Sequence, residues 1–372
     1  TEYRDTHNWI FMLLPVAGVL IVFMYEKIGR QDGGTNQVLA TIKSKDDVPF
    51  LSAPLIFVST LLTHLTGGSA GREGASIQFG GSIGNWLGKL AHLDEFDHHV
   101  MIMCGMSAAF AAVFGTPMAA AVFAMEVVSV GGMDYAALLP CVIAAIIAAE
   151  FATGMGIDPE TFPVHSIPGL TVETGLKMAL IAVGCGILSI LFCILLKTVG
   201  QLYTKYLKNP YIRIVVAAGV IILLTIGLNT KDYMGAGSGL IARAIEKGEA
   251  RPLDFLWKML LTALTMRAGY RGGEIVPAFS IGATFGCVAG GILGFSPELA
   301  AAASMVALFC GVTNCPITAM LISFELFGFS GAAYYLIAIS ISYAVSGYYS
   351  LYKDQTIVYS KYKARYINRK TR

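Results

Sequence analysis

Long uncharged stretches dominate the chain and predict helices that cross a membrane. No Asp, Glu, Lys or Arg occurs in residues 9–25, 48–71, 100–125, 135–149, 178–196, 214–230, 275–297, 299–324 and 326–352. A transmembrane helix needs about 20 mainly apolar residues. Several stretches are longer than one span and are interrupted by residues such as Pro117, Pro277 and Pro316. These breaks predict shorter helices, some ending inside the membrane, where the freed backbone must be buried in protein or line a site.

Composition supports the same class of protein. The 372 residues are 55% hydrophobic and 13% charged, whereas about 25% of residues are charged in an average soluble domain. These values exclude a soluble enzyme, a disordered protein and a coiled coil. The formal net charge of +2 is too small to indicate nucleic-acid binding. The seven cysteines form no CxxC motif and the six histidines have no metal-ligand spacing, so we expect no metal and no organic cofactor.

Two motifs each occur twice, in the same order. FGTPMAAAVFAMEV and TNCPITAMLISFEL both place a proline nine residues before a glutamate, with an offset of 199 between the copies. Upstream, residues 71–84 and 273–286 share three glycines at an offset of 202. We interpret this as a duplication within one transmembrane domain, residues 1–372, with halves at about 8–170 and 171–360. Such halves usually enclose a site near the membrane midplane, but the motifs do not say whether the second half is inverted.

A carboxylate stands among glycines in GSAGREGAS, residues 68–76. Gly71 and Gly74 allow backbone N–H groups at a helix start to approach an anion, and the helix dipole favours negative charge there. Glu73 therefore lies where an anion would bind. A carboxylate at membrane depth is costly and is by default a functional candidate. The alternative is an ion pair between Glu73 and Arg72 at the membrane surface.

Three further features have both a functional and a plain structural interpretation. In RGGEIVPAF, Glu274 is a second acid at an equivalent helix start, or simply a charge that favours the helix dipole. Thr35 or Asn36 begins another helix and is either an anion ligand or an ordinary N-cap. Glu126 and Glu325 end apolar runs, and we interpret them as interfacial caps or ion-pair partners.

The motifs together resemble the CLC family of chloride channels and anion/proton antiporters. GREGASIQFGGSIG resembles the family's GREGP…GG.IG motif, AAVFGTPMAAAVFAMEV the helix that follows it, GGEIVPAF the GxFxP motif, and Tyr352 the tyrosine of the last membrane helix. The resemblance covers about residues 8–360. It implies an all-α membrane protein with an inverted-repeat fold and broken helices, and a homodimer with one pathway in each subunit. It also implies that the family's first helices would precede Thr1.

Departures from the family pattern point to its fluoride-exporting branch. GGTNQ replaces the chloride-binding GSGIP motif, Ala75 replaces the proline of GREGP, and Ile275 replaces the phenylalanine of GxFxP. Val127 stands where chloride/proton transporters carry their inner proton-relay glutamate. Glu274 is an added acid where the family is usually apolar. The fluoride branch lacks the chloride-coordinating serine of the GSGIP motif and the inner proton-relay glutamate, and it still exchanges protons.

These features lead us to expect an antiporter that exports fluoride in exchange for protons. Glu73 would be the gating and proton-carrying glutamate, and Glu274 a possible second proton acid. The anion path would be lined by Gly34, Thr35, Asn36, Gly71, Arg72, Gly74, Ala75, Ile275, Val276 and Tyr352. The alternative within the family is a chloride/proton antiporter or a chloride channel. A membrane-embedded enzyme would need a convergent acid, base or nucleophile set, which the sequence does not contain.

The location follows from the spans and the basic end. We expect a multi-pass protein surrounded by lipid in the cell membrane, most simply a bacterial plasma membrane. Residues 361–372 carry six basic and no acidic residues. The positive-inside rule therefore predicts a basic cytoplasmic tail.

Overall fold

The computed structural model describes residues 7, 9–28, 33–43, 48–363 and 365–371. The expected start of the first half at residue 8, and residues 364 and 372 of the basic tail, lie outside this described part. The helices are η1 (Ile10–Leu13), α2 (Leu14–Lys27), α3 (Thr35–Thr41), α4 (Ser52–Leu65), α5 (Glu73–Leu90), α6 (Glu95–Phe114), α7 (Pro117–Glu126), η2 (Tyr135–Ala137), α8 (Leu138–Gly154), α9 (Val172–Tyr206), α10 (Pro210–Gly227), α11 (Ser238–Glu246), α12 (Asp254–Ala268), α13 (Ile275–Ile292), α14 (Pro297–Thr313), α15 (Pro316–Phe327) and α16 (Ala332–Val345). The strands are β1 (Ser129–Val130), β2 (Thr356–Tyr359) and β3 (Tyr366–Lys370).

The long uncharged stretches do form helices, and the breaks divide them in the same way in both halves. Six helical stretches of the described chain are long and apolar enough to span a membrane. In the first half, Gly115 adopts a left-handed conformation and ends α6, and Pro117 begins α7. In the second half, Asn314 ends α14 in the same conformation and Pro316 begins α15. A left-handed residue after a helix and a proline in the next first turn are the usual stop and start signals.

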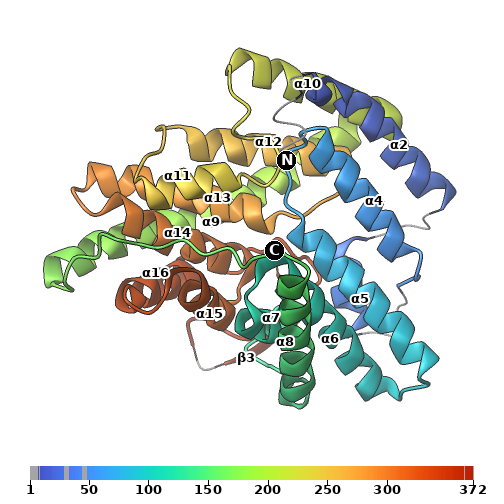
Figure 1. The fold of residues 1–372 in the computed structure, drawn as a ribbon, viewed down its shortest axis with the longest axis horizontal. Helices are drawn as coiled ribbons and strands as arrows, with labels where there is room; N and C mark the ends of the chain where they lie inside the picture. Colours follow the sequence, from blue (N-terminus) through green and yellow to red (C-terminus); the bar gives the residue numbers. More distant parts are fainter. Residues whose placement is uncertain (1–6, 8, 29–32, 44–47, 364, 372) are drawn as a thin grey trace.

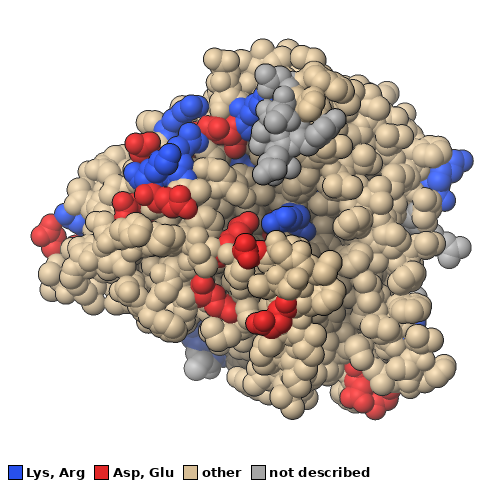
Figure 2. Space-filling model, viewed as in Figure 1, with Lys and Arg blue, Asp and Glu red and all other residues tan. Residues whose placement is uncertain are grey.

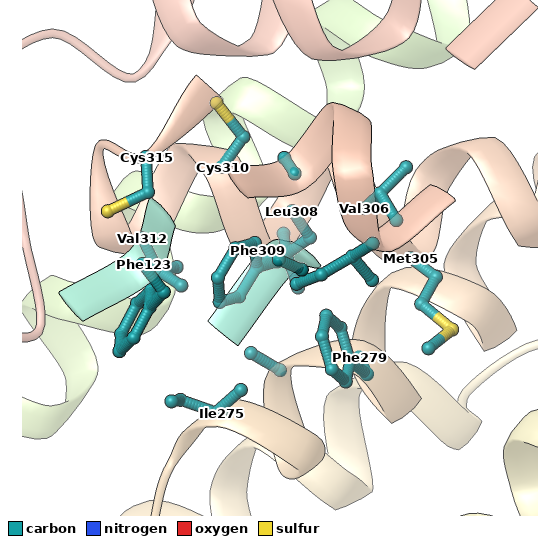
Figure 3. Close-up of a cluster of buried hydrophobic side chains, with 14 of the residues drawn as sticks. Phe123, Ile275, Phe279, Met305, Val306, Leu308, Phe309, Cys310, Val312 and Cys315 are labelled. Carbon is teal, nitrogen blue, oxygen red and sulfur yellow. The ribbon is translucent and has the colours of Figure 1, made fainter. Parts of the chain in front are cut away.

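The core lies around α14. Every residue from Leu299 to Thr313 is buried, and Figure 3 shows Phe309 of this helix between Phe123 and Phe279. The ring centroids of Phe309 lie 6.1 Å from those of Phe123 and 5.2 Å from those of Phe279. The peripheral helix α8 (Figure 1) instead leaves large apolar side chains such as Leu139 and Phe151 exposed. Such a surface suits lipid, since acyl chains are as apolar as these side chains.

The glycines shared by the repeats pack helices together. A Cβ atom on Gly80 would collide with the carbonyl of Gly105 in α6, and one on Gly282 would meet the carbonyl of Ser304 in α14 at 2.5 Å. Small residues let helices approach closely in a membrane, where burial from water does not drive their association. These two repeated glycines therefore serve the α5–α6 and α13–α14 contacts.

The two halves are antiparallel to each other. Gly71 and Gly273 form an antiparallel bridge, with N···O distances of 2.7 Å and 2.6 Å. At the end of α7, the Glu126 carboxylate accepts hydrogen bonds from the first N–H groups of α15. Glu325, near the end of α15, accepts in turn from the first N–H groups of α7. Each glutamate thus caps the helix of the other half, so α7 and α15 are antiparallel and the repeat is inverted.

The basic end differs from a simple solvated tail. Residues 366–370 form β3, which pairs antiparallel with β2, while β2 pairs parallel with β1 after α7. The sequence offered no clear strand signal here, because basic residues alternate with tyrosines over only a few positions. The small sheet joins the end of the second half to the first half and leaves the helical class unchanged.

Candidate functional site

Three helix starts converge at the predicted site. The bridge between Gly71 and Gly273 brings the start of α5 beside that of α13. The Thr35 hydroxyl, in the first turn of α3, donates a hydrogen bond of 3.0 Å to the carbonyl of Gly74. The sequence segments 34–36, 71–75 and 273–277 thus lie together. Helix starts carry unpaired N–H groups and the positive end of the dipole, so this junction is suited to an anion.

Two glycines make this junction possible. A Cβ atom at Gly74 would lie 2.9 Å from the Cα of Gly273, so a larger residue would push the two helix starts apart. A Cβ atom at Gly71 would collide with Oε2 of Glu73. Gly71 therefore provides the space in which the Glu73 carboxylate lies.

The Glu73 side chain is enclosed but incompletely satisfied. The residue is 3% exposed, and its Oε2 atom has no hydrogen-bond partner. The Nε atom of Arg72 lies 3.9 Å from Oε1, and a terminal nitrogen of Arg72 lies 3.7 Å from the Glu160 carboxylate. Leaving a buried polar atom unpaired costs about 1–3 kcal/mol, and more for a charged group. Glu73 is therefore buried with one carboxylate oxygen unsatisfied, beside the junction of helix starts.

A cavity of about 950 Å³ adjoins Glu73. Its lining combines Val276 and Phe114 with the charged residues Arg72, Lys231 and Asp232. On the face of the molecule in Figure 2, charged side chains gather in a few groups and leave most of the surface uncharged. The cavity thus gives the Glu73 carboxylate a polar space next to the junction of helix starts.

Asn36 also has an unsatisfied group at the junction. Its Oδ1 atom is buried without a hydrogen-bond partner. Rotation of the amide would place its NH₂ group there instead, because the two ends of an amide have nearly the same shape. The side chain can therefore offer a donor to an anion. Ala75, Ile275 and Val276, predicted along the same path, are buried beside the helix starts.

Two of the predicted residues, Glu274 and Tyr352, do not line the cavity beside Glu73. Glu274 lies with Oε1 3.6 Å from a terminal nitrogen of Arg267 in α12, and it does not belong to the residues that line the cavity beside Glu73. Tyr352 is buried near the end of α14, where the preceding Leu351 N–H donates to the carbonyl of Val312. Glu73 therefore lines this cavity and Glu274 does not, although their backbones start neighbouring helices.

Sequence reasoning missed a buried lysine behind the Glu73 motif. Lys258 of α12 is 0% exposed, and its ammonium donates to the Ser69 hydroxyl at 3.0 Å and to the Gly235 carbonyl at 2.6 Å. The ammonium thereby joins the segment before Gly71 to the wall of the cavity. The available signal was a single charge within the apolar run FLWKMLL.

The fold and site define a multi-pass membrane protein with inverted halves and an anion-type junction of helix starts. The sequence profile described as "Voltage gated chloride channel" matches residues 17–347. The chain therefore belongs to this family, the CLC proteins, and the predicted resemblance is confirmed. The family consists of transport proteins rather than enzymes.

Individual relatives show the same relationship. The chain is 34% identical to a "Chloride/fluoride channel protein" of Pseudomonas syringae pv. tomato over 97% of this chain and 82% of the relative. It is 27% identical to the "H(+)/Cl(-) exchange transporter ClcA" of Vibrio cholerae, over 69% of this chain and 58% of that protein. The crystal structure of a CLC-type fluoride/proton antiporter superposes with a TM-score of 0.91 and 34% identity, covering 95% of this chain and 90% of the other.

Proposed function

We propose that this chain is a fluoride/proton antiporter that exports fluoride across the cell membrane, with Glu73 as its gate. The observation that carries the proposal is the buried Glu73 carboxylate, with an unpartnered oxygen between two helix starts. Two similar proteins, at 34% identity, bear names that include fluoride. Their coverage of nearly the whole chain supports the same transport chemistry here.

The gate works by competition for one position. The charged Glu73 carboxylate occupies the space over Gly71 and excludes an anion. After taking up a proton, the neutral Glu73 side chain is no longer attracted by the positive helix starts, and it withdraws toward the cavity. A fluoride ion then binds where the carboxylate was, close to backbone N–H groups that replace its water. Proton binding and fluoride binding are thereby linked.

Thr35 and Asn36 contribute selectivity, and Gly34, Arg72, Gly74, Ala75, Ile275, Val276 and Tyr352 line the remaining path. A small and strongly hydrated anion requires donors at short range, because each unreplaced hydrogen bond to water costs affinity. The Asn36 amide supports this role, since it lies in the first turn of α3 with an unsatisfied buried atom. Glu274 is proposed as a second acid that assists proton movement from its position next to Arg267.

Ion flux in liposomes tests the proposal directly. The purified chain is reconstituted, a pH gradient is imposed, and fluoride and proton movement are recorded together, with chloride as the comparison. We expect uphill fluoride movement driven by protons. Proton-driven chloride accumulation with no fluoride movement would favour the chloride/proton antiporter, and chloride flux without protons would favour a chloride channel.

The assembly and location are part of the same proposal. We propose a homodimer in a bacterial plasma membrane with a cytoplasmic C-terminus. The exposed apolar side chains of α8 support burial in lipid or against a second copy, and the basic residues after 360 support a cytoplasmic end. Cross-linking in native membranes tests the dimer, and protease access to the tail in sealed vesicles tests the orientation.

A further inference from the structure

The segment that follows α16 returns to the first half of the molecule. Its strand β2 lies beside β1, with Ser129 opposite Thr356 and Val130 opposite Ile357. The connection between α16 and β2 contains Tyr352, which the proposed function assigns to the anion path. What holds this connection is therefore relevant to transport.

Gln355 is the central residue of this connection. It is 0% exposed, and its side-chain NH₂ donates to the carbonyl of Val127 at 3.0 Å and to that of Thr313 at 2.7 Å. Its Oε1 accepts from the Asn314 amide at 3.1 Å and from the Ser350 hydroxyl at 2.9 Å. All hydrogen-bonding positions of the donor end and both lone pairs of the acceptor end are in use.

The partners of Gln355 come from separate parts of the chain. Val127 follows α7 in the first half, whereas Thr313 and Asn314 end α14 in the second half. A buried polar group with all its bonds made specifies one arrangement of its neighbours, because every alternative leaves several groups unpaired. Gln355 therefore fixes the end of α14 relative to the end of α7.

The same residues hold the backbone of Tyr352. The Tyr352 N–H donates to the Ser350 hydroxyl at 3.1 Å, and the Gln355 N–H donates to the Tyr352 carbonyl at 3.2 Å. The Thr371 hydroxyl, after β3, donates to that carbonyl as well, at 2.7 Å. The position of the buried tyrosine thus depends on the Gln355 network and on the strand that closes over it.

We propose that Gln355 is a positioning residue for transport, which keeps Tyr352 in one place between the two halves while Glu73 moves. This inference rests on the proposed function, because it assigns Tyr352 to the fluoride path. If Tyr352 shifts freely, fluoride passes without waiting for the protonation of Glu73. The expected defect is therefore a leak, in which fluoride moves with fewer protons.

The experiment measures protons moved per fluoride in liposomes containing the full chain. Gln355→Met keeps the size of the side chain and removes all four hydrogen bonds. Ser350→Ala removes the acceptor of the Tyr352 N–H and one donor to Gln355, and it serves as the second variant if Gln355→Met does not give a monodisperse protein. Lys363→Ala, at an exposed position between β2 and β3, is the matched control.

We expect both network variants to lose proton-driven fluoride accumulation while passive fluoride efflux continues, with Lys363→Ala unchanged. A purely structural role would lower both fluxes together and leave their ratio the same, which would overturn the inference. Retention of the parental ratio in a well-folded Ser350→Ala would also overturn it. A parent that moves no fluoride against protons refutes the proposed function itself, before the variants are compared.

Discussion

Glu73 and Glu126 are both buried glutamates at contacts between the two halves, yet their surroundings are opposite. Glu73 is 3% exposed and Glu126 is 4% exposed. The Glu126 carboxylate accepts from the N–H groups of Ile317 and Thr318 and from the Thr318 hydroxyl, at 2.7–3.0 Å. Glu73 has one oxygen without any partner and adjoins a cavity.

The two carboxylates differ in the hydrogen-bond donors around them and not in their burial. A carboxylate that completes the start of a helix is stabilised by that helix and has no reason to move. Glu73 is equally buried, but one of its oxygens has no such donor and the side chain lies beside a cavity. Glu126 joins the halves, whereas the role proposed for Glu73 is in the transport cycle.

The largest effect is expected from Glu73→Gln. The amide cannot take up or release a proton, so proton-driven fluoride accumulation in liposomes should be lost. The variant should still fold, since Glu73 contributes few hydrogen bonds. A Glu73→Gln protein that pumps fluoride at the parental rate would show that Glu73 is not the gate.

Glu126→Ala should act on stability instead. The change leaves two N–H groups at the start of α15 and one hydroxyl without their charged acceptor, and bonds of this kind contribute about 1.5–3 kcal/mol each, partly offset by water. We expect a lower thermal midpoint in detergent and a normal proton-to-fluoride ratio in the folded fraction. Glu325→Ala, which removes two such bonds from a more exposed carboxylate, should have a smaller effect. An unchanged midpoint in both variants would show that the reciprocal caps contribute nothing.

Glu274→Gln should leave the fold and Glu73 intact and slow or uncouple exchange. The change removes a proton-carrying group with little change in shape, whereas Glu274→Ala also removes its packing. Arg267→Gln is the control, because it breaks the ion pair and keeps the acid. Normal coupling of protons to fluoride in both Glu274 variants would show that Glu274 pairs with Arg267 and does not carry protons.

Serine at position 35 or 36 should shift the anion preference toward chloride. Altering one donor near a bound ion changes relative affinity by up to about tenfold. Parallel fluoride and chloride efflux measurements give the ratio. Thr41→Ser, at the other end of α3, is the control, since its hydroxyl donates to the Gln37 carbonyl within the same helix. An unaltered preference for fluoride over chloride in both variants would show that the start of α3 does not determine selectivity.

The smallest effect concerns Lys361, outside the membrane-spanning helices. Burial lowers the pKa of its ammonium to about 8, while an unfolded lysine titrates near 10.4. Between these values the unfolded chain binds more protons, so stability should rise with pH from about 8 to 10.4. We would measure the free energy of unfolding of the parent and of Lys361→Met across this pH range. It should rise with pH in the parent and not in Lys361→Met. Lys363→Met, exposed in the same hairpin, should behave like the parent.

Much of the fold followed from local chemistry in the chain. Uncharged runs of sufficient length predicted the membrane helices, and Pro117 and Pro316 marked where two of them begin. The motif copies predicted that residues near 71 and 273 would be equivalent. The small sheet was not predicted, because β2 pairs with β1, which contains two residues and lies more than 200 positions away in the sequence, and β3 joins only through β2.

The sequence by itself determined the membrane class, the two halves, the family resemblance and the acid at the glycine-rich helix start. These properties depend on residue type and spacing along one chain. The inverted orientation of the halves followed only from the family resemblance, because the motif copies alone did not fix it. The tertiary structure alone decided that Glu126 and Glu325 cap each other's helices, and that Glu274 pairs with Arg267 while Glu73 adjoins a cavity. Each of these depends on which distant backbone groups become neighbours, and a carboxylate acquires its role from the donors that surround it.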